Sequence, residues 1–509
     1  MTESQTSARL MALQADASRS MNEHTIVPTD LTARAGGVLA PVLVVDLDGT
    51  LIRTDMLYET FWAALSNHWL NVAAVLRALP RGRAALKRTL ARLGPLDVAS
   101  LPFNEEVLDY VRRWRDQGGR TALVSATDHR LVERISEHVG LFDDAYGSDG
   151  TVNLKGPRKA AFLSARFPGG FVYMGDSGSD YAIWERAKQA VTVDVPGLLR
   201  SRVDALAIAS EHLTTRGSLV SAFWRALRPH QWLKNTLVFL PLLAAHQFDS
   251  VSIGKAVLAF VAYSLVASSV YLLNDLLDLA ADRAHPRKRA RPFASGALPL
   301  AWGTALVPGL LLAGSLVSLL LGPAFLAIMA IYYVLTTVYS FVLKRLLIID
   351  ICALAALYTL RIVAGGFATD VYLSVWLLAF SIFFFFSLAA MKRQTELVSS
   401  VEEGEGKAYG RGYITGDLPL VTNMAVGSGY VSVLVMALYL NSPAVRQLYF
   451  ETAPLWGICL VLLFWLSRMV MLAHRGQMQD DPVVFAAQDK VSMLCAGLIF
   501  GLAVAGMIM

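Results

Sequence analysis

Nine apolar segments follow one another in the second part of the chain, and they limit its fold more than any other feature. They span roughly residues 233–248, 254–273, 299–320, 323–342, 346–366, 371–390, 419–440, 453–472 and 491–509. Most approach the ~20 residues that a helix needs to cross a bilayer, and the first is short. Residues 216–509 are therefore predicted to form an all-α polytopic membrane domain of about nine transmembrane helices.

The first part has the composition of a soluble domain. Of the 45 basic and 40 acidic residues, residues 1–225 hold 26 and 25. Residues 1–36 are polar and lack an apolar core, which predicts a disordered tail. Expected strands at 40–45, 121–125 and 170–174 alternate with helical patterns, which favours an α/β fold with a parallel sheet. This domain is predicted to cover residues 37–215, with a small helical cap at about 56–100.

The basic residues of the membrane half are unevenly distributed between its connections. With the soluble domain inside, the basic clusters fall on its own side, and the opposite connections hold little beyond Arg446. This asymmetry predicts a multi-pass protein of the inner (cytoplasmic) membrane. The soluble domain and the candidate active sites of both halves, described below, are expected on the cytoplasmic side. The net charge of +5 is modest and sits mostly between apolar runs, which disfavours nucleic acid as a partner. An oligomer is compatible with the sequence.

Polar clusters stand directly after the expected strands, where parallel sheets carry their chemistry. Asp46 can attack phosphorus as a nucleophile, and Asp48 points the same way and can serve as acid and base. Asp176 and Asp180 can complete a Mg²⁺ site with these two carboxylates. Two further residues can meet phosphoryl oxygens, with Lys159 as an alternative lysine: Lys155 and Ser125.

These residues resemble the four motifs of the haloacid dehalogenase superfamily, over about residues 40–210. The motifs read Asp46-Leu-Asp48-Gly-Thr, Ser125, Lys155 in Asn-Leu-Lys-Gly, and Gly-Asp176-Ser-Gly-Ser-Asp180. The resemblance implies a Rossmann-like phosphatase domain, since the second carboxylate Asp48 favours a phosphatase over a dehalogenase. The segment at about 56–100 matches the small helical cap of such phosphatases.

An acidic motif lies at the end of the second apolar segment. Its spacing lets all its polar groups share one helical face: Asn274, Asp275, Asp278 and Asp282. Three carboxylates on one helical face repel one another unless a divalent cation, which can also bind a polyphosphate, compensates their charge. The motif therefore predicts a second Mg²⁺ site, giving one in each domain.

Basic residues suited to phosphate oxygens follow the acidic motif. The run from Arg283 to Pro292 contains three of the candidates: His285, Lys288 and Arg291. Further candidates on the same side of the membrane are Lys344, Arg361 and Lys392. Arg361 lies inside an apolar segment, and pairing with Asp350 is the alternative explanation for it.

The acidic motif resembles that of the UbiA-type membrane prenyltransferase superfamily, over roughly residues 225–509. The His285-Pro-x-Lys288-x-x-Arg291-Pro run looks like its decaprenyl-phosphate phosphoribosyltransferase branch. Leu354 stands where aromatic prenyltransferases usually have the second carboxylate of Asp-x-x-x-Asp, counted from Asp350. The resemblance implies phosphoribosyl pyrophosphate and a polyprenyl phosphate as partners.

Together the two resemblances imply a bifunctional enzyme. The transferase would attach 5-phosphoribose to the lipid, and the phosphatase would remove the 5-phosphate, giving lipid-linked ribose for cell-surface polysaccharide. Two alternatives stay open at this point. One is an aromatic or quinone-precursor prenyltransferase with an unrelated phosphatase, and the other is a lipid-carrier flippase module.

Overall fold

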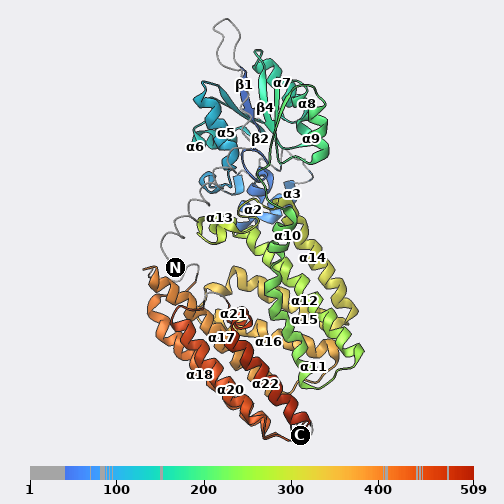
Figure 1. Cartoon of the computed structure of the whole chain (residues 1–509), viewed down its shortest axis with the longest axis vertical. Coiled ribbons are helices and arrows are strands. Elements are labelled where there is room, and N and C mark those ends of the chain that lie inside the picture. The colour runs from blue at the N-terminus through green and yellow to red at the C-terminus, as the bar shows by residue number, and fades with distance from the viewer. Residues whose placement is uncertain are drawn as a thin grey trace, which may run out of the picture.

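The computed structural model describes most of the chain from residue 41 to residue 508. The residues outside the description are 1–40, 69, 79, 81–85, 87–88, 91, 95, 149–152, 405, 407–410, 443–444, 446–448, 450, 479–480 and 509. The tail expected at 1–36 and Arg446 therefore lie outside the described residues. The sheet domain occupies one end of the molecule and the helical domain the other (Figure 1).

The first domain is built on a six-stranded, wholly parallel sheet, as predicted. The strand order is β3-β2-β1-β4-β5-β6. The strands are β1 Val42–Val45, β2 Thr121–Asp128, β3 Asp144–Ser148, β4 Phe171–Gly175, β5 Gln189–Val193 and β6 Ala209–Leu213. The helices between them are α5 Glu105–Asp116, α6 His129–Val139, α7 Pro157–Arg166, α8 Tyr181–Trp184 and α9 Gly197–Asp204.

The central strand β1 is buried along its whole length. Alternate residues enter different cores: Leu43 packs in the cluster on one face of the sheet and Val44 in the cluster on the other. Val45 pairs with Met174 of β4, so the two strands end at the same edge. This register brings the residues that follow β1 and β4 together, including Asp46 and Asp176.

The second domain contains eight helices long and apolar enough to cross a membrane. They are α12 Ser250–Leu277, α14 Leu300–Leu320, α15 Pro323–Phe341, α16 Ile349–Thr369, α17 Val375–Glu402, α18 Leu418–Leu440, α20 Trp456–His474 and α22 Lys490–Ile508. The segment predicted at 233–248 forms instead a 3-10 helix, Pro229–Phe239, and the short α11, Leu240–Ala244. Buried Lys234 and Asn235 lie within that 3-10 helix, where they bond to other polar side chains.

Two of these helices form the centre of the domain. The most apolar window is 61% buried in α12 and 67% in α16, against 17% in α22. Polar side chains on α12 and α16 are therefore enclosed by other helices, whereas α22 presents most of its surface outward. Asp275 lies on α12 and Arg361 on α16, and both side chains are buried.

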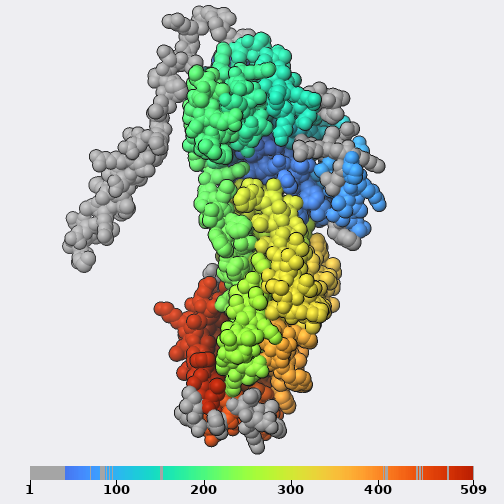
Figure 2. Space-filling model, turned by 90° about the vertical axis from the view of Figure 1, so that its right-hand side faces the viewer, coloured from blue at the N-terminus to red at the C-terminus, as the bar shows by residue number. Residues whose placement is uncertain are grey.

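The two domains meet through helix α2, Met56–Asn67, which is part of the segment expected as a cap. Helix α2 packs against α12, α14 and α13, which spans Leu279–Ala284. Figure 1 and Figure 2 both show this segment between the sheet and the membrane helices. The remaining helices are α3 Asn71–Ala78, α10 Leu219–Leu227 and α21 Pro482–Gln488, with short 3-10 turns at Val98–Ser100, Gly178–Asp180, Lys288–Ala290, Leu343–Arg345 and Thr415–Asp417.

Candidate functional sites

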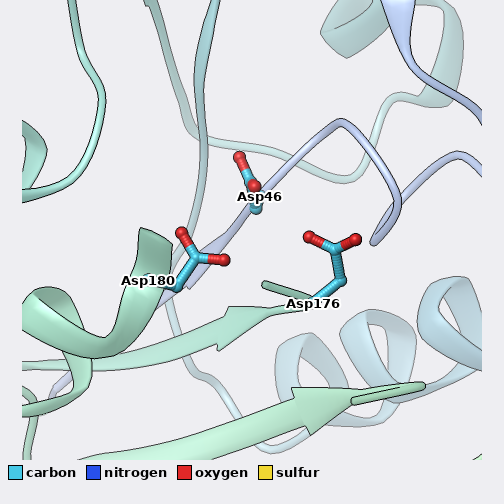
Figure 3. A group of neighbouring side chains, drawn as sticks. All are labelled: Asp46, Asp176 and Asp180. Atoms are coloured by element: carbon cyan, nitrogen blue, oxygen red, sulfur yellow. The ribbon is translucent and has the colours of Figure 1, made fainter. Parts of the chain in front are cut away.

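Three carboxylates gather at the carboxyl edge of the sheet. Oxygen atoms of Asp46, Asp176 and Asp180 lie within 4.8 Å of one another. Figure 3 shows the three side chains turned toward a common space, with Asp46 after β1 and Asp176 after β4. Gly49 closes the loop after β1 with a φ of +76°, and a Cβ there would lie 2.0 Å from an oxygen of Asp176. Only glycine fits this turn on both counts.

The electrostatics of this group favour a bound cation. Burial raises the pKa of Asp46 to about 7; Lys159 opposes the rise, and Asp180 and Asp48 add to it. Burial, followed by repulsion from Asp46 and Asp180, also raises the pKa of Asp176 well above its ordinary value. A divalent cation would offset the repulsion between these carboxylates, and hard oxygen ligands are those that Mg²⁺ prefers.

The lysine beside Asp46 is Lys159, the alternative in the sequence interpretation. Its Nζ donates to Asp46 Oδ1 at 2.7 Å and to the Tyr173 hydroxyl at 2.8 Å, and the side chain is 3% exposed. Lys155 is exposed and lines the cavity above the site. The structure thus brings the alternative lysine, Lys159, into contact with Asp46, because α7 begins at Pro157 and its first turn carries Lys159 inward.

Asp48 lines the same cavity as the three carboxylates but has hydrogen-bond partners of its own. Its Oδ2 accepts from the hydroxyls of Ser125 at 3.2 Å and Thr127 at 3.1 Å. Its Oδ1 accepts from the backbone N–H of Met56 at 2.7 Å, at the start of α2. Within the described residues, then, the carboxylates grouped for a metal are Asp46, Asp176 and Asp180, without Asp48. Sequence reasoning missed Thr127, although it lies two residues after Ser125 on the same strand.

The acidic motif of the membrane domain spans a break between two helices. Helix α12 ends at Leu277, and Asp278 has the non-helical angles φ −96° and ψ 15° before α13 begins. The expected single helical face is therefore interrupted, because the carboxylates lie on two helices. Asp275 and Asp282 are buried, whereas the Asp278 side chain is 47% exposed.

Arginines, rather than other carboxylates, surround Asp275 and Asp282. Arg291 Nη1 lies 3.1 Å from Asp275 and 2.7 Å from Asp282, and Arg228 also donates to Asp275. The second oxygen of Asp275 is buried without a hydrogen-bond partner. Among the described residues, the motif carboxylates do not approach as closely as the three at the sheet edge.

The other predicted basic residues take different places around this motif. Lys344 lies 3.9 Å from Asp278, on the exposed side of the break. The ring of His285 accepts from the backbone N–H groups of Arg287 and Lys288, which fixes the turn after α13. Lys288 is half-buried beside this turn. Asn274 precedes Asp275 in the last turn of α12 and is also half-buried.

Arg361 and Lys392 belong to a second polar cluster. Asp481 accepts from Lys234 at 2.7 Å, Lys392 at 3.0 Å and the Tyr358 hydroxyl at 2.8 Å. Arg361 donates to Asn235 at 3.0 Å and to the Tyr332 hydroxyl at 3.1 Å, and its guanidinium lies 5.6 Å from the ring centroid of Tyr358.

Asp350 does not pair with Arg361. It lies 2.6 Å from Arg393 and accepts from the Tyr413 hydroxyl at 2.6 Å. The alternative explanation for Arg361 is therefore wrong. Lys234 and Lys392 thus share the carboxylate of Asp481, and the buried Arg361 bonds to neutral groups, so the cluster carries an excess of positive charge. A buried excess of positive charge favours an anion.

The fold and these sites define a multi-pass membrane protein with a hydrolase-like domain on one side. Comparison with known families agrees: residues 235–493 match the UbiA prenyltransferase family, and residues 43–185 match the haloacid dehalogenase-like hydrolases. The chain belongs to the UbiA prenyltransferase family and carries a haloacid dehalogenase-like hydrolase domain.

Similar proteins share one or both domains. The chain is 39% identical to the uncharacterized protein y4nM of Sinorhizobium fredii, over 90% of this chain and 89% of that one, so the similarity crosses both domains. It is 38% identical to the nodulation protein NoeC of Azorhizobium caulinodans, over 55% of this chain and 92% of that one. It is 42% identical to the decaprenyl-phosphate phosphoribosyltransferase of Mycolicibacterium smegmatis, over 38% of this chain and 64% of that enzyme.

Proposed function

We propose that the membrane domain transfers 5-phosphoribose from phosphoribosyl pyrophosphate to a polyprenyl phosphate. An oxygen of the lipid phosphate attacks C1 of the ribose, and the bond from C1 to the pyrophosphate oxygen breaks. The relatives named decaprenyl-phosphate phosphoribosyltransferases support this reaction. The basic residues near the acidic motif would hold the phosphate groups of the donor: His285, Lys288, Arg291 and Lys344.

The observation that carries this proposal is that the membrane domain contains two charged clusters, the acidic motif with its arginines and the basic cluster around Asp481. Arg228 donates to Asp275, and its guanidinium lies 5.6 Å from the ring of Tyr271, one turn earlier on α12. The acidic motif suits a cation with a pyrophosphate, and the Lys234–Arg361–Lys392 cluster suits a second anion, the acceptor phosphate. An aromatic acceptor has no phosphate, so the excess positive charge of the Lys234–Arg361–Lys392 cluster would stay uncompensated. This disfavours the aromatic prenyltransferase alternative.

A divalent cation fits the acidic motif. The unpartnered buried oxygen of Asp275 and the half-exposed Asp278 offer hard oxygen ligands. Asn274, Asp275, Asp278 and Asp282 would hold Mg²⁺, which supplies positive charge for the leaving pyrophosphate when bound. Arg291 lies against two of these carboxylates and would meet the same phosphate oxygens.

The hydrolase domain would remove the 5-phosphate from the lipid-linked product. Asp46 attacks phosphorus, and Asp48 gives a proton to the leaving ribose oxygen and then takes one from the water that releases phosphate. Asp46, Asp176 and Asp180 would hold a second Mg²⁺, which supplies positive charge for the phosphoryl oxygens. Ser125 and Thr127 hold Asp48 in place, and Lys159 holds Asp46. The product would be a ribose donor for cell-surface polysaccharide.

The distribution of basic residues supports a cytoplasmic location for both sites. Arg291 and Lys344 pair with carboxylates of the acidic motif, and α13 of that motif packs against α2, next to the hydrolase domain. Cytoplasmic connections are those enriched in Lys and Arg. Phosphoribosyl pyrophosphate is a soluble, charged donor, so its site is expected to open to the cytoplasm.

Thermal protection by the donor tests the transferase assignment. A ligand that binds only the folded protein stabilises it by about 2.7 kcal/mol at a hundred times its Kd. We expect phosphoribosyl pyrophosphate with Mg²⁺ to raise the melting temperature of the purified protein, and geranyl pyrophosphate with Mg²⁺ to raise it less. The reverse ranking would favour a prenyl donor and contradict the proposal.

A matched pair of lysine variants tests the hydrolase site. Lys159→Met removes the cation beside Asp46, and we expect hydrolysis of 4-nitrophenyl phosphate to fall by about 10²-fold or more. Lys155→Met removes an exposed lysine of the same cavity, and we expect a much smaller loss. A larger loss in Lys155→Met would restore Lys155 as the catalytic lysine.

A further inference from the structure

The cavity above the hydrolase carboxylates is bounded by both domains. It has a volume of about 760 Å³ and contains Asp46, Asp48 and Asp176 in its wall. Part of the same wall comes from the first residues of the membrane helix α14 and the residue before it, Pro299, Leu300 and Ala301. The substrate site of the hydrolase is therefore completed by a segment that lies more than 100 residues beyond the end of the hydrolase match.

Helix α2 fixes this composite wall in place. Glu59 accepts two hydrogen bonds from Arg283, at 2.6 and 3.1 Å, and both side chains are at most 7% exposed. Trp62 Nε1 donates to the hydroxyl of Thr304 on α14 at 3.0 Å. A buried, bidentate ion pair with a second polar contact resists sliding, because breaking it would leave charged groups unpaired. The position of α14 against the hydrolase cavity is therefore set by direct contacts.

The same helix places the hydrolase close to the acidic motif. The N–H of Met56 holds Asp48, and Glu59, three residues later, holds Arg283. Arg283 directly follows Asp282 in the sequence. Three residues of an α-helix rise about 4.5 Å. One turn of α2 thus links a catalytic carboxylate of the hydrolase to the end of the transferase motif.

The cavity wall combines charged and apolar residues. Arg53, Arg158 and Arg216 line it and suit phosphate and sugar oxygens. Leu300 and Ala301 line it where α14, a candidate membrane span, begins. Trp302, the next residue, is half exposed, as is common for tryptophan at a membrane surface. A cavity that contains arginines and also apolar residues at the start of a candidate membrane span suits an amphiphile.

We propose that Pro299, Leu300 and Ala301 form a specificity wall that admits a phosphomonoester carried on a membrane-anchored lipid. The headgroup phosphate reaches Asp46 past the arginines, and the lipid part leaves the cavity along the start of α14. This inference rests on the proposed function and names the form of its substrate. Soluble phosphate esters reach Asp46 but make no use of the wall.

A substitution at Ala301 tests the wall. We expect Ala301→Trp to lower kcat/KM for 5-phosphoribosyl polyprenyl phosphate in mixed micelles about tenfold more than kcat/KM for 4-nitrophenyl phosphate. Ala301→Leu adds less volume and is expected to change the same ratio in the same direction. Ala305→Trp is the matched control, because Ala305 is exposed one turn further along α14 and does not line the cavity.

The outcomes separate the wall from the proposed function. In one outcome the wild type hydrolyses both substrates, but Ala301→Trp and Ala301→Leu leave the ratio of the two kcat/KM values unchanged. The proposed specificity wall is then wrong, and the proposed function stands. If the wild type hydrolyses 4-nitrophenyl phosphate but not the lipid-linked ester, both are overturned. If Ala305→Trp changes the ratio as much as Ala301→Trp does, the proposal of a specificity wall is also wrong.

Discussion

Replacing Asp46 by asparagine is expected to leave ribosyl transfer running and to make 5-phosphoribosyl polyprenyl phosphate accumulate. The variant keeps the shape of the side chain but removes the nucleophile, and losses of about 10³-fold or more are typical of such changes. It also leaves the buried Lys159 without its carboxylate, so the melting temperature of the variant is compared with that of the wild type. Mass spectrometry of the lipid fraction distinguishes the two lipids, which differ by one phosphate.

The accumulated lipid should stay in the membrane fraction. Each buried methylene contributes about 0.8 kcal/mol, so a polyprenyl chain does not leave the bilayer readily. A hydrolase fixed at the same membrane surface meets that headgroup at a raised effective concentration. Asp109→Asn is a suitable control, because Asp109 is exposed on α5 and lies outside the cavity and the three-carboxylate group. Identical lipid products from wild type and Asp46→Asn would contradict the coupling of the two domains.

The second large effect is expected at the acidic motif. Asp278→Asn should lower ribosyl transfer by about 10²–10³-fold, as removal of one group from a preorganised charged site commonly does. Asp278 suits this test because its side chain is half exposed and its cationic neighbour, Lys344, is 3.9 Å away. Asp275 is a poorer choice, since its removal would leave Arg228 and Arg291 without their shared carboxylate.

Hydrolysis of 4-nitrophenyl phosphate is the internal control for Asp278→Asn. We expect it to stay at the wild-type rate, because Asp278 is absent from the wall of the hydrolase cavity. Asp417→Asn offers a matched surface substitution in the membrane domain, at the 3-10 turn before α18. Loss of both activities in Asp278→Asn would contradict the assignment of transfer to this motif.

The sequence was sufficient for the fold class because its patterns were long and regular. Eight of nine predicted apolar segments are spanning helices, and the strands at 40–45, 121–125 and 170–174 are β1, β2 and β4. Strands β3, β5 and β6 were not predicted. The residues of β3 and β6, at the edges of the sheet, are only partly buried or exposed, whereas the buried run of β5 was not singled out. The first apolar segment failed as a span because Lys234 and Asn235 make buried polar contacts there.

The hydrolase site was predicted because its carboxylates stand at the ends of recognisable strands. Asp46, Asp176 and Asp180 follow motif spacing, and the structure brings them together. The choice between Lys155 and Lys159 depended on where α7 starts, which the sequence did not define. The pair of Lys234 and Asp481 is separated by 247 residues, so no local pattern could reveal it. The signals of that cluster were its basic residues within apolar segments, of which the sequence interpretation used Arg361 and left out Lys234.

The most direct test supplies the purified protein with polyprenyl phosphate, phosphoribosyl pyrophosphate and Mg²⁺, and follows the lipids by mass spectrometry. We expect 5-phosphoribosyl polyprenyl phosphate to form first and ribosyl polyprenyl phosphate to replace it, with release of pyrophosphate and then phosphate. Transfer of a prenyl group to an aromatic acid instead, with no ribosylated lipid, would contradict the proposed function.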